Sequence, residues 1–81
     1  MTIEQIERFI GTAPDRSSRI FLKARTVEGL FIKAPDFLEL KKKNFWRIVS
    51  VYRMQEYLES KDINLSRIFN GQEFTKLSLI S

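Results

Sequence analysis

The sequence predicts one α+β domain in which a small antiparallel sheet of about five strands follows an N-terminal helix. The apolar residues have helical spacing at the start of the chain and a period of two from residue 19 onward. Three isolated glycines and two prolines divide the remainder into short segments. At 81 residues the chain fits a single domain with a small core, and it has no cysteine to staple that core.

Residues 3–10 are predicted to form an amphipathic helix. Thr2 and Gln5 match a capping box, in which the two side chains satisfy free backbone amides of the first turn. The apolar face consists of Ile3, Ile6, Phe9 and Ile10. Gly11 stands where a helix-terminating glycine is expected. Because so short a helix is unstable alone, its apolar face must dock on the sheet.

Four consecutive strands are predicted, over residues 19–26, 30–34, 37–41 and 45–53. The first two would form a hairpin with its turn at residues 27–29. Pro35 and Asp36 would separate the second strand from the third. Asn44, which tolerates a left-handed conformation, would sit in the turn before the fourth strand. Residues 45–53 are rich in β-branched and aromatic side chains, and a helix there is the alternative.

The last third of the chain is predicted to contain short helices and a closing strand. Residues 54–60 contain good helix formers and predict a short helix. Asn64 as N-cap and Gly71 after the end predict another over residues 65–70. Alternatively, Asn70-Gly71 forms a type I′ hairpin turn. Alternation over residues 73–80 predicts the last strand.

A leading helix, a meander of strands, a short helix and a late strand resemble the layout of small SH3-like and Sm-like barrels. The resemblance concerns the order of elements along the whole chain. It implies that the five strands curl into a small barrel, which is one way for a small sheet to cover its apolar face.

The absence of cysteine and histidine excludes several classes of function. No zinc signature, Ser-His-Asp triad or Cys-His pair can be assembled. The glycines are isolated, so there is no phosphate-binding loop. We therefore expect a protein that is not an enzyme and uses no cofactor or metal. No secretory signal or membrane-spanning segment is recognisable, and a cytoplasmic protein without a membrane partner is expected.

Positive charge is concentrated in the middle of the chain. The net charge is +4, whereas residues 16–53 contain ten Lys or Arg against three acids, a net charge of +7. A concentrated basic surface attracts polyanions without identifying which one. Single-stranded RNA or another polyanion is the predicted partner.

The predicted nucleic-acid site combines a charged corner with one face of the sheet. The corner is formed by Lys41, Lys42, Lys43 and Arg47, beside Phe45 and Trp46. The side chains expected to face the core are Ile20, Leu22, Leu30, Ile32, Leu38 and Leu40. Strand alternation would then place a second group on the opposite face: Phe21, Lys23, Arg25, Phe31, Lys33, Phe37, Glu39 and Lys41. Cations along a backbone and aromatics that stack bases are the combination used by single-strand binders.

Structural explanations compete with this interpretation. Phe21, Phe31 and Phe37 can instead be buried beneath the N-terminal helix, which would give a sheet with two covered faces. Lysines at a turn also discourage edge-to-edge association of sheets. The alternative function is a protein-interaction or self-assembling module, with a protein partner or a homo-oligomer. Arg16, Arg19 and Arg67 become phosphate contacts only if the fold brings them beside the lysine corner.

Overall fold

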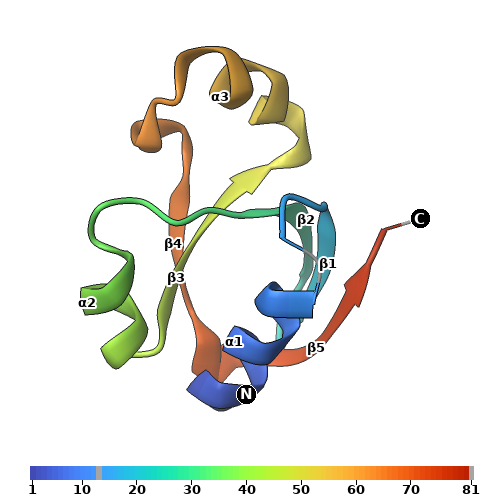
Figure 1. The fold of residues 1–81 in the computed structure, drawn as a ribbon. Coiled ribbons are helices and arrows are strands. Elements are labelled where there is room, and N and C mark those ends of the chain that lie inside the picture. The colour runs from blue at the N-terminus through green and yellow to red at the C-terminus, as the bar shows by residue number, and fades with distance from the viewer. Residues whose placement is uncertain (13, 81) are drawn as a thin grey trace.

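The computed structural model describes residues 1–12 and 14–80 and confirms the α+β class (Figure 1). Its helices and strands are α1 (Ile3–Thr12), β1 (Ser18–Leu22), β2 (Thr26–Phe31), α2 (Phe37–Lys42), β3 (Phe45–Ser50), α3 (Met54–Ser60), β4 (Arg67–Asn70) and β5 (Phe74–Leu79). Three 3₁₀ turns join them: η1 (Val51–Arg53), η2 (Ile63–Leu65) and η3 (Gly71–Glu73).

The five strands form one antiparallel sheet in the order β4-β3-β2-β1-β5. Strands β1 to β4 form a meander, and β5 returns after η3 to pair with β1. The sheet is strongly curved, with α1 inside the curve (Figure 1). Within residues 1–12 and 14–80, β4 and β5 do not pair with each other, so the sheet is open and not a closed barrel.

Helix α1 begins with the predicted capping box. The Thr2 amide donates to Oε1 of Gln5 at 3.0 Å, and the Gln5 amide donates to Oγ1 of Thr2 at 3.2 Å. Ile6 and Ile10 are buried, as their spacing predicts. The helix includes Gly11 and ends later than expected, because Gly11 does not adopt the left-handed conformation of a terminating glycine.

Two apolar clusters cover the two faces of the sheet. On the α1 side, Ile6 and Ile10 pack with sheet residues that include Ile20, Trp46 and Phe74. On the other side, Leu30, Ile32 and Val49 are covered by Met54 and Tyr57 of α3 and by Ile63. The structural alternative of a sheet with two covered faces is therefore the arrangement observed.

The first hairpin turns four residues earlier than predicted. Residues 27–29 lie within β2, and the chain turns at residues 23–25, where the Leu22 amide donates to the Arg25 carbonyl at 2.8 Å. Val27, opposite Ile20, and Phe31, opposite Ile48, therefore face α1. Leu30 and Ile32, expected on the same face as Ile20, lie on the other one, because the position of the turn sets which side chains point inward.

Residues 37–41, predicted as a strand, belong to helix α2. The segment contains Leu, Glu and Lys, which favour helices, and its short alternation is compatible with either structure. Phe37 packs edge-on against Trp46 with ring centroids 6.0 Å apart, and Leu40 one turn later is half-buried. Leu38, expected in the core, is 64% exposed.

Residues 65–70, predicted as a helix, are mostly strand. Asp62, rather than Asn64, caps the preceding turn η2 by accepting the Asn64 amide at 3.0 Å. Strand β4 then pairs with β3, with Phe69 opposite Trp46. This long-range pairing overrides the short helical pattern. The alternative type I′ turn is also wrong, because Gly71 has no positive φ and begins η3.

The other C-terminal predictions agree more closely with the structure. Strand β3 covers residues 45–50 of the predicted 45–53, and the remainder is η1. Helix α3 is confirmed over residues 54–60, and β5 lies within the predicted 73–80. Asn44 has the expected left-handed conformation, with φ 63°.

Candidate nucleic-acid interface

The predicted lysine corner lies at the end of α2. Lys41 forms an ion pair with Glu7 of α1, with Nζ 2.6 Å from Oε2, and its side chain is 24% exposed. Lys42 and Lys43 are exposed. Cations in the last turn of a helix are stabilised by its dipole, which gives these lysines a structural explanation.

Arg47 is occupied by an intramolecular contact. Its guanidinium donates to both carboxylate oxygens of Asp36, with the shortest bond 2.8 Å, and to Oγ of Ser66 at 3.2 Å. Its side chain is 18% exposed. The hydrogen bonds from Arg47 lower the pKa of Asp36 below its ordinary value of 3.8, and they raise the pKa of Arg47. Arg47 therefore joins α2 to the sheet and is not free to contact a phosphate.

This ion pair predicts a specific acid sensitivity. The pKa of Asp36 is lower in the folded chain than in the unfolded one, so the stabilisation is complete above pH 3.8 and disappears as the pH falls through the lowered value. We expect the free energy of unfolding, measured by urea titration, to decline below about pH 4. In Asp36→Asn this decline should be shallower. Parallel curves for the two proteins would contradict the assignment.

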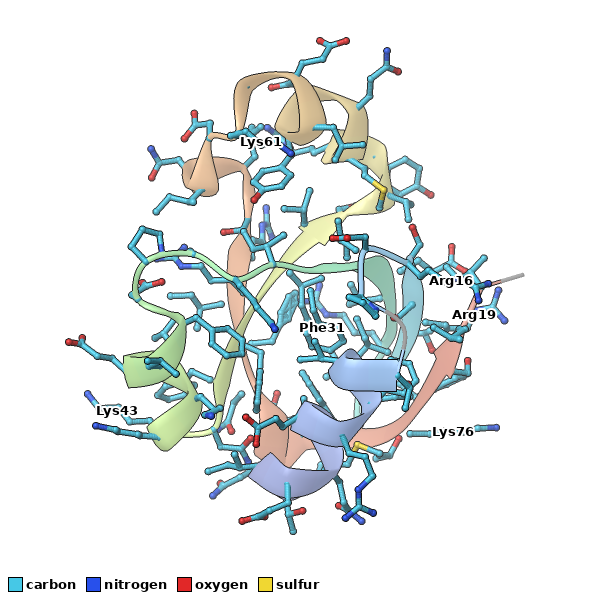
Figure 2. The ribbon with its side chains drawn as sticks, viewed as in Figure 1. Arg16, Arg19, Phe31, Lys43, Lys61 and Lys76 are labelled. Atoms are coloured by element: carbon cyan, nitrogen blue, oxygen red, sulfur yellow. The ribbon has the colours of Figure 1, made fainter. Side chains whose placement is uncertain are left out.

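The remaining predicted residues do not form one surface. Phe31 packs edge-on against Phe9, Trp46 and Phe74 within the core, so it is not exposed for stacking. Lys33 lies over the Phe37 ring at 5.7 Å. Phe21 is half-buried and lies beneath Lys76 of β5. In Figure 2, Lys43 lies on the α2 side, away from Lys76 and Arg19 on the opposite side.

The structure instead reveals a groove beside β4. Two hollows of about 360 and 280 Å³ share Arg25, Arg67 and Phe69 and are therefore adjacent. They run between the β1–β2 turn and β4, at the side where the sheet remains open. We call this the seam groove. Its cations are Lys23, Arg25, Arg53 and Arg67, and its aromatic residues are Tyr52 and Phe69.

Cations and aromatic rings are close neighbours in the seam groove. The Arg25 guanidinium lies 5.7 Å from the centre of the Phe69 ring. Tyr52 is 93% exposed, although it is a large aromatic residue. Glu73 lines the first hollow, and among the described residues no acid lines the second. In the part of the chain that the structure describes, none of the four groove cations forms an ion pair.

Local backbone contacts position these side chains. The Lys23 amide donates to the Glu73 carbonyl at 3.1 Å, which holds the β1–β2 turn against the start of β5. Arg67 and Phe69 pair with Ile48 and Trp46, so both project from the concave face of β4. Oγ of Ser50 accepts the Tyr52 amide at 3.3 Å and caps η1. The groove therefore combines three separate chain segments.

The sequence identified only part of this groove. Lys23 and Arg25 belong to it, and Arg67, considered only beside the lysine corner, lies here instead. Tyr52, Arg53 and Phe69 were not predicted as site residues. Arg67 and Phe69 are two residues apart, the spacing that places two side chains on the same face of a strand. This spacing indicated the groove, but residues 65–70 were predicted to be a helix.

Protein-family models, curated proteins and solved structures were compared with the chain, and none matched. No helix among the described residues has the length and apolar character required to cross a bilayer. Within the same residues, no acidic side chains cluster in a way that would hold a metal ion.

Proposed function

We propose that this domain binds single-stranded nucleic acid, most naturally RNA, along the seam groove and without catalysis. The observation that carries the proposal is the set of four cations without ion-pair partners around Phe69 and Tyr52 in the described structure. Cations follow a phosphate backbone, and exposed aromatic rings stack on bases of any sequence. Arg67 and Arg25 would provide planar guanidinium groups, which can contact a phosphate with two hydrogen bonds.

RNA is favoured over duplex DNA because of the shape of the groove. Duplex readers commonly insert a helix or a two-stranded ribbon into the major groove. The seam groove lies beside one edge strand, with an aromatic ring in its wall. Such a surface suits unstacked bases, which sequence-tolerant RNA proteins hold against aromatic side chains.

Binding should depend strongly on salt. If all four groove cations contact phosphates, the affinity for single-stranded RNA should fall about 50-fold between about 50 and about 200 mM salt. Fluorescence anisotropy with a labelled oligouridine measures this dependence, and light scattering on the same sample reports the oligomeric state. No binding at low salt and about micromolar protein would contradict the proposal, because non-specific affinities should be measurable there.

Self-assembly through the sheet edges has weaker support. Strands β4 and β5 are the two edges, and Ile68 and Leu79 on them are 49% and 39% exposed. However, β4 also carries Arg67 and β5 carries Lys76, both exposed. Cations on edge strands are a common protection against edge pairing, so we favour the nucleic-acid proposal.

A further inference from the structure

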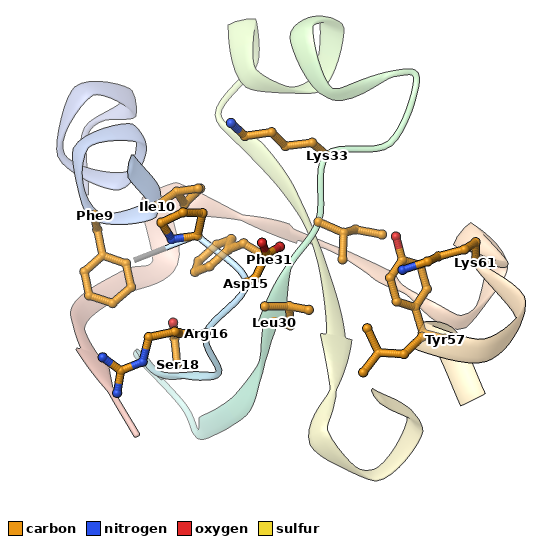
Figure 3. Close-up of a pocket in the computed structure, with 13 residues that line it drawn as sticks. Phe9, Ile10, Asp15, Arg16, Ser18, Leu30, Phe31, Lys33, Tyr57 and Lys61 are labelled. Carbon is orange, nitrogen blue, oxygen red and sulfur yellow. The ribbon is translucent and has the colours of Figure 1, made fainter. Parts of the chain in front are cut away.

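A second pocket, of about 410 Å³, lies where α1, β2 and α3 approach one another (Figure 3). It shares no lining residue with the seam groove. Leu30, Ile32 and Tyr57 belong to the cluster beneath α3, whereas Phe31 and Ile10 belong to the cluster beneath α1. The pocket therefore opens between the two cores, and its size is within the range of small-ligand sites.

The pocket wall is about as polar as it is apolar, and its polar side chains are mostly charged. Phe9, Leu30, Phe31 and Tyr57 provide much of the wall. Among the described residues that line it, only Ser18 and Tyr57 carry a neutral side-chain hydroxyl. A ligand with many polar edges, such as a nucleobase or a sugar, would leave hydrogen-bonding groups unpaired, and this is costly. The apolar part of the wall suits an apolar body, and the charged part suits a charged group.

The charges around the pocket are mainly positive. Arg16, Lys33 and Lys61 line it, and Asp15 is the single acid among the described lining residues. Lys61 crosses the Tyr57 ring, with Nζ 5.6 Å from its centre, and its amino group points into the pocket in Figure 3. Arg16 extends outward at the left of the view, and Lys33 lies above the pocket. Of these three cations, Lys61 is the one whose amino group points into the pocket in this view.

Lys61 occupies an unusual backbone position. It follows α3 with φ 59°, in the left-handed region that glycine adopts most easily at a helix end. Its amide donates to the Tyr57 carbonyl at 2.6 Å, a contact that glycine would make equally well. Helix termination therefore does not explain why position 61 carries a lysine side chain. The direction of this side chain into the pocket provides a reason for the lysine.

We propose that this pocket binds an organic anion with an apolar body and a single carboxylate head held by Lys61. A carboxylate beside an apolar side chain occurs at the C-terminal residue of a peptide and in a small free acid. Both sources present the same chemistry to the pocket. The apolar body would contact Leu30 and Phe31, while the net positive mouth would favour the charged end over a neutral one.

An NMR titration tests the proposal with N-acetyl-L-phenylalanine as the probe. Saturable shifts are expected at the amides of residues 30–33 and 57–61. N-acetyl-L-phenylalaninamide lacks the charge and N-acetylglycine lacks the apolar side chain, so each should bind about tenfold more weakly or worse. No saturable shift at the pocket, or equal binding of the amide, would overturn the proposal.

Lys61→Gly tests the role of Lys61 in ligand binding without destabilising the fold. Glycine relieves the left-handed backbone, so the melting temperature should be unchanged or higher. Affinity for N-acetyl-L-phenylalanine should nevertheless fall about tenfold, because the charged partner is lost. Lys61→Arg should retain most of the affinity, and Lys43→Gly, outside the pocket, should retain all of it. Wild-type affinity in folded Lys61→Gly would overturn the assignment of Lys61.

A final comparison distinguishes the two sources of the carboxylate. A pentapeptide that ends in phenylalanine with a free carboxylate is compared with N-acetyl-L-phenylalanine and with its own C-terminal amide. Tighter binding of the free peptide identifies a peptide C-terminus as the ligand. Weaker binding than the acetylated residue identifies a small free acid. Equal binding of the free and the amidated peptide overturns the carboxylate requirement in both cases.

Discussion

Replacing Arg25, Arg53 and Arg67 together by serine is expected to lower the affinity for a single-stranded oligouridine by about a hundredfold or more at low salt. All three are exposed and line the seam groove. The structure shows no ion pair for them among the described residues, so the melting temperature should change little. The slope of affinity against salt should also decrease, because fewer phosphates would be neutralised.

The lysine corner provides a control with the same change in charge. Lys41→Ser, Lys42→Ser and Lys43→Ser together also remove three positive charges. Lys41 already pairs with Glu7, and the corner does not line the groove. We expect the corner variant to lose only a few-fold in affinity through the general field of the protein. A larger loss for the corner variant than for the groove variant would place the site on α2 instead.

Gly71→Ala is expected to cause a large loss of stability. Gly71 is buried, and a Cβ there would overlap Oδ1 of Asn44 and lie 2.7 Å from Cδ1 of Ile6. Asn44 cannot move easily, because it is held by several hydrogen bonds. Oδ1 of Asn44 accepts Nε1 of Trp46 at 2.8 Å, its Nδ2 donates to the Met1 carbonyl at 3.0 Å, and its own carbonyl accepts the Gly71 amide at 2.7 Å.

The expected cost is about 3 kcal/mol, because the substitution overpacks a core and breaks buried hydrogen bonds. For a domain of this size that loss lowers the melting temperature by about 15 °C, which thermal circular dichroism measures directly. Gly11→Ala is the matched control. Its Cβ would meet nothing within 4 Å, and it lies within α1, so alanine should stabilise the domain slightly. Equal melting temperatures for Gly71→Ala and wild type would contradict this account of the Asn44 contacts.

The parts of the fold that could be predicted depend on local signals. The capping box of Thr2 and Gln5 defines the start of α1, and both hydrogen bonds of the box are present. Asn44 adopts the left-handed conformation that its short polar side chain tolerates. Helix α3 likewise follows from residues that favour helices. In each case neighbouring residues along the chain contain the necessary information.

The incorrect predictions arose where distant contacts decide the structure. The turn at Lys23 contains no glycine, proline or asparagine, and its amide is held by Glu73 near the other end of the chain. Because the turn lies four residues earlier than predicted, each side chain of β2 points to the opposite face from the one expected. Phe31 therefore packs against Trp46. Likewise, pairing of Phe69 with Trp46 made residues 67–70 a strand. A short helical pattern cannot reveal such pairing.

Only part of the seam groove could be predicted from the sequence. Lys23 and Arg25 were predicted from the charge of this segment and from strand alternation, which are local properties, and both are exposed. Arg53 and Phe69 reach the groove only after β4 has paired with β3. Arg47 was chosen for its charge, but its charge is used by Asp36, which the sequence alone does not show.

An NMR map of the RNA contact surface tests directly whether RNA binds in the seam groove. Isotope-labelled protein would be titrated with oligouridine at low salt, and amide shifts would be plotted on the structure. We predict that the largest shifts occur at residues 23–25, 52–53 and 67–69, which line the seam groove. Shifts confined to residues 41–43, or no saturable shift at all, would contradict the proposal that the seam groove binds RNA.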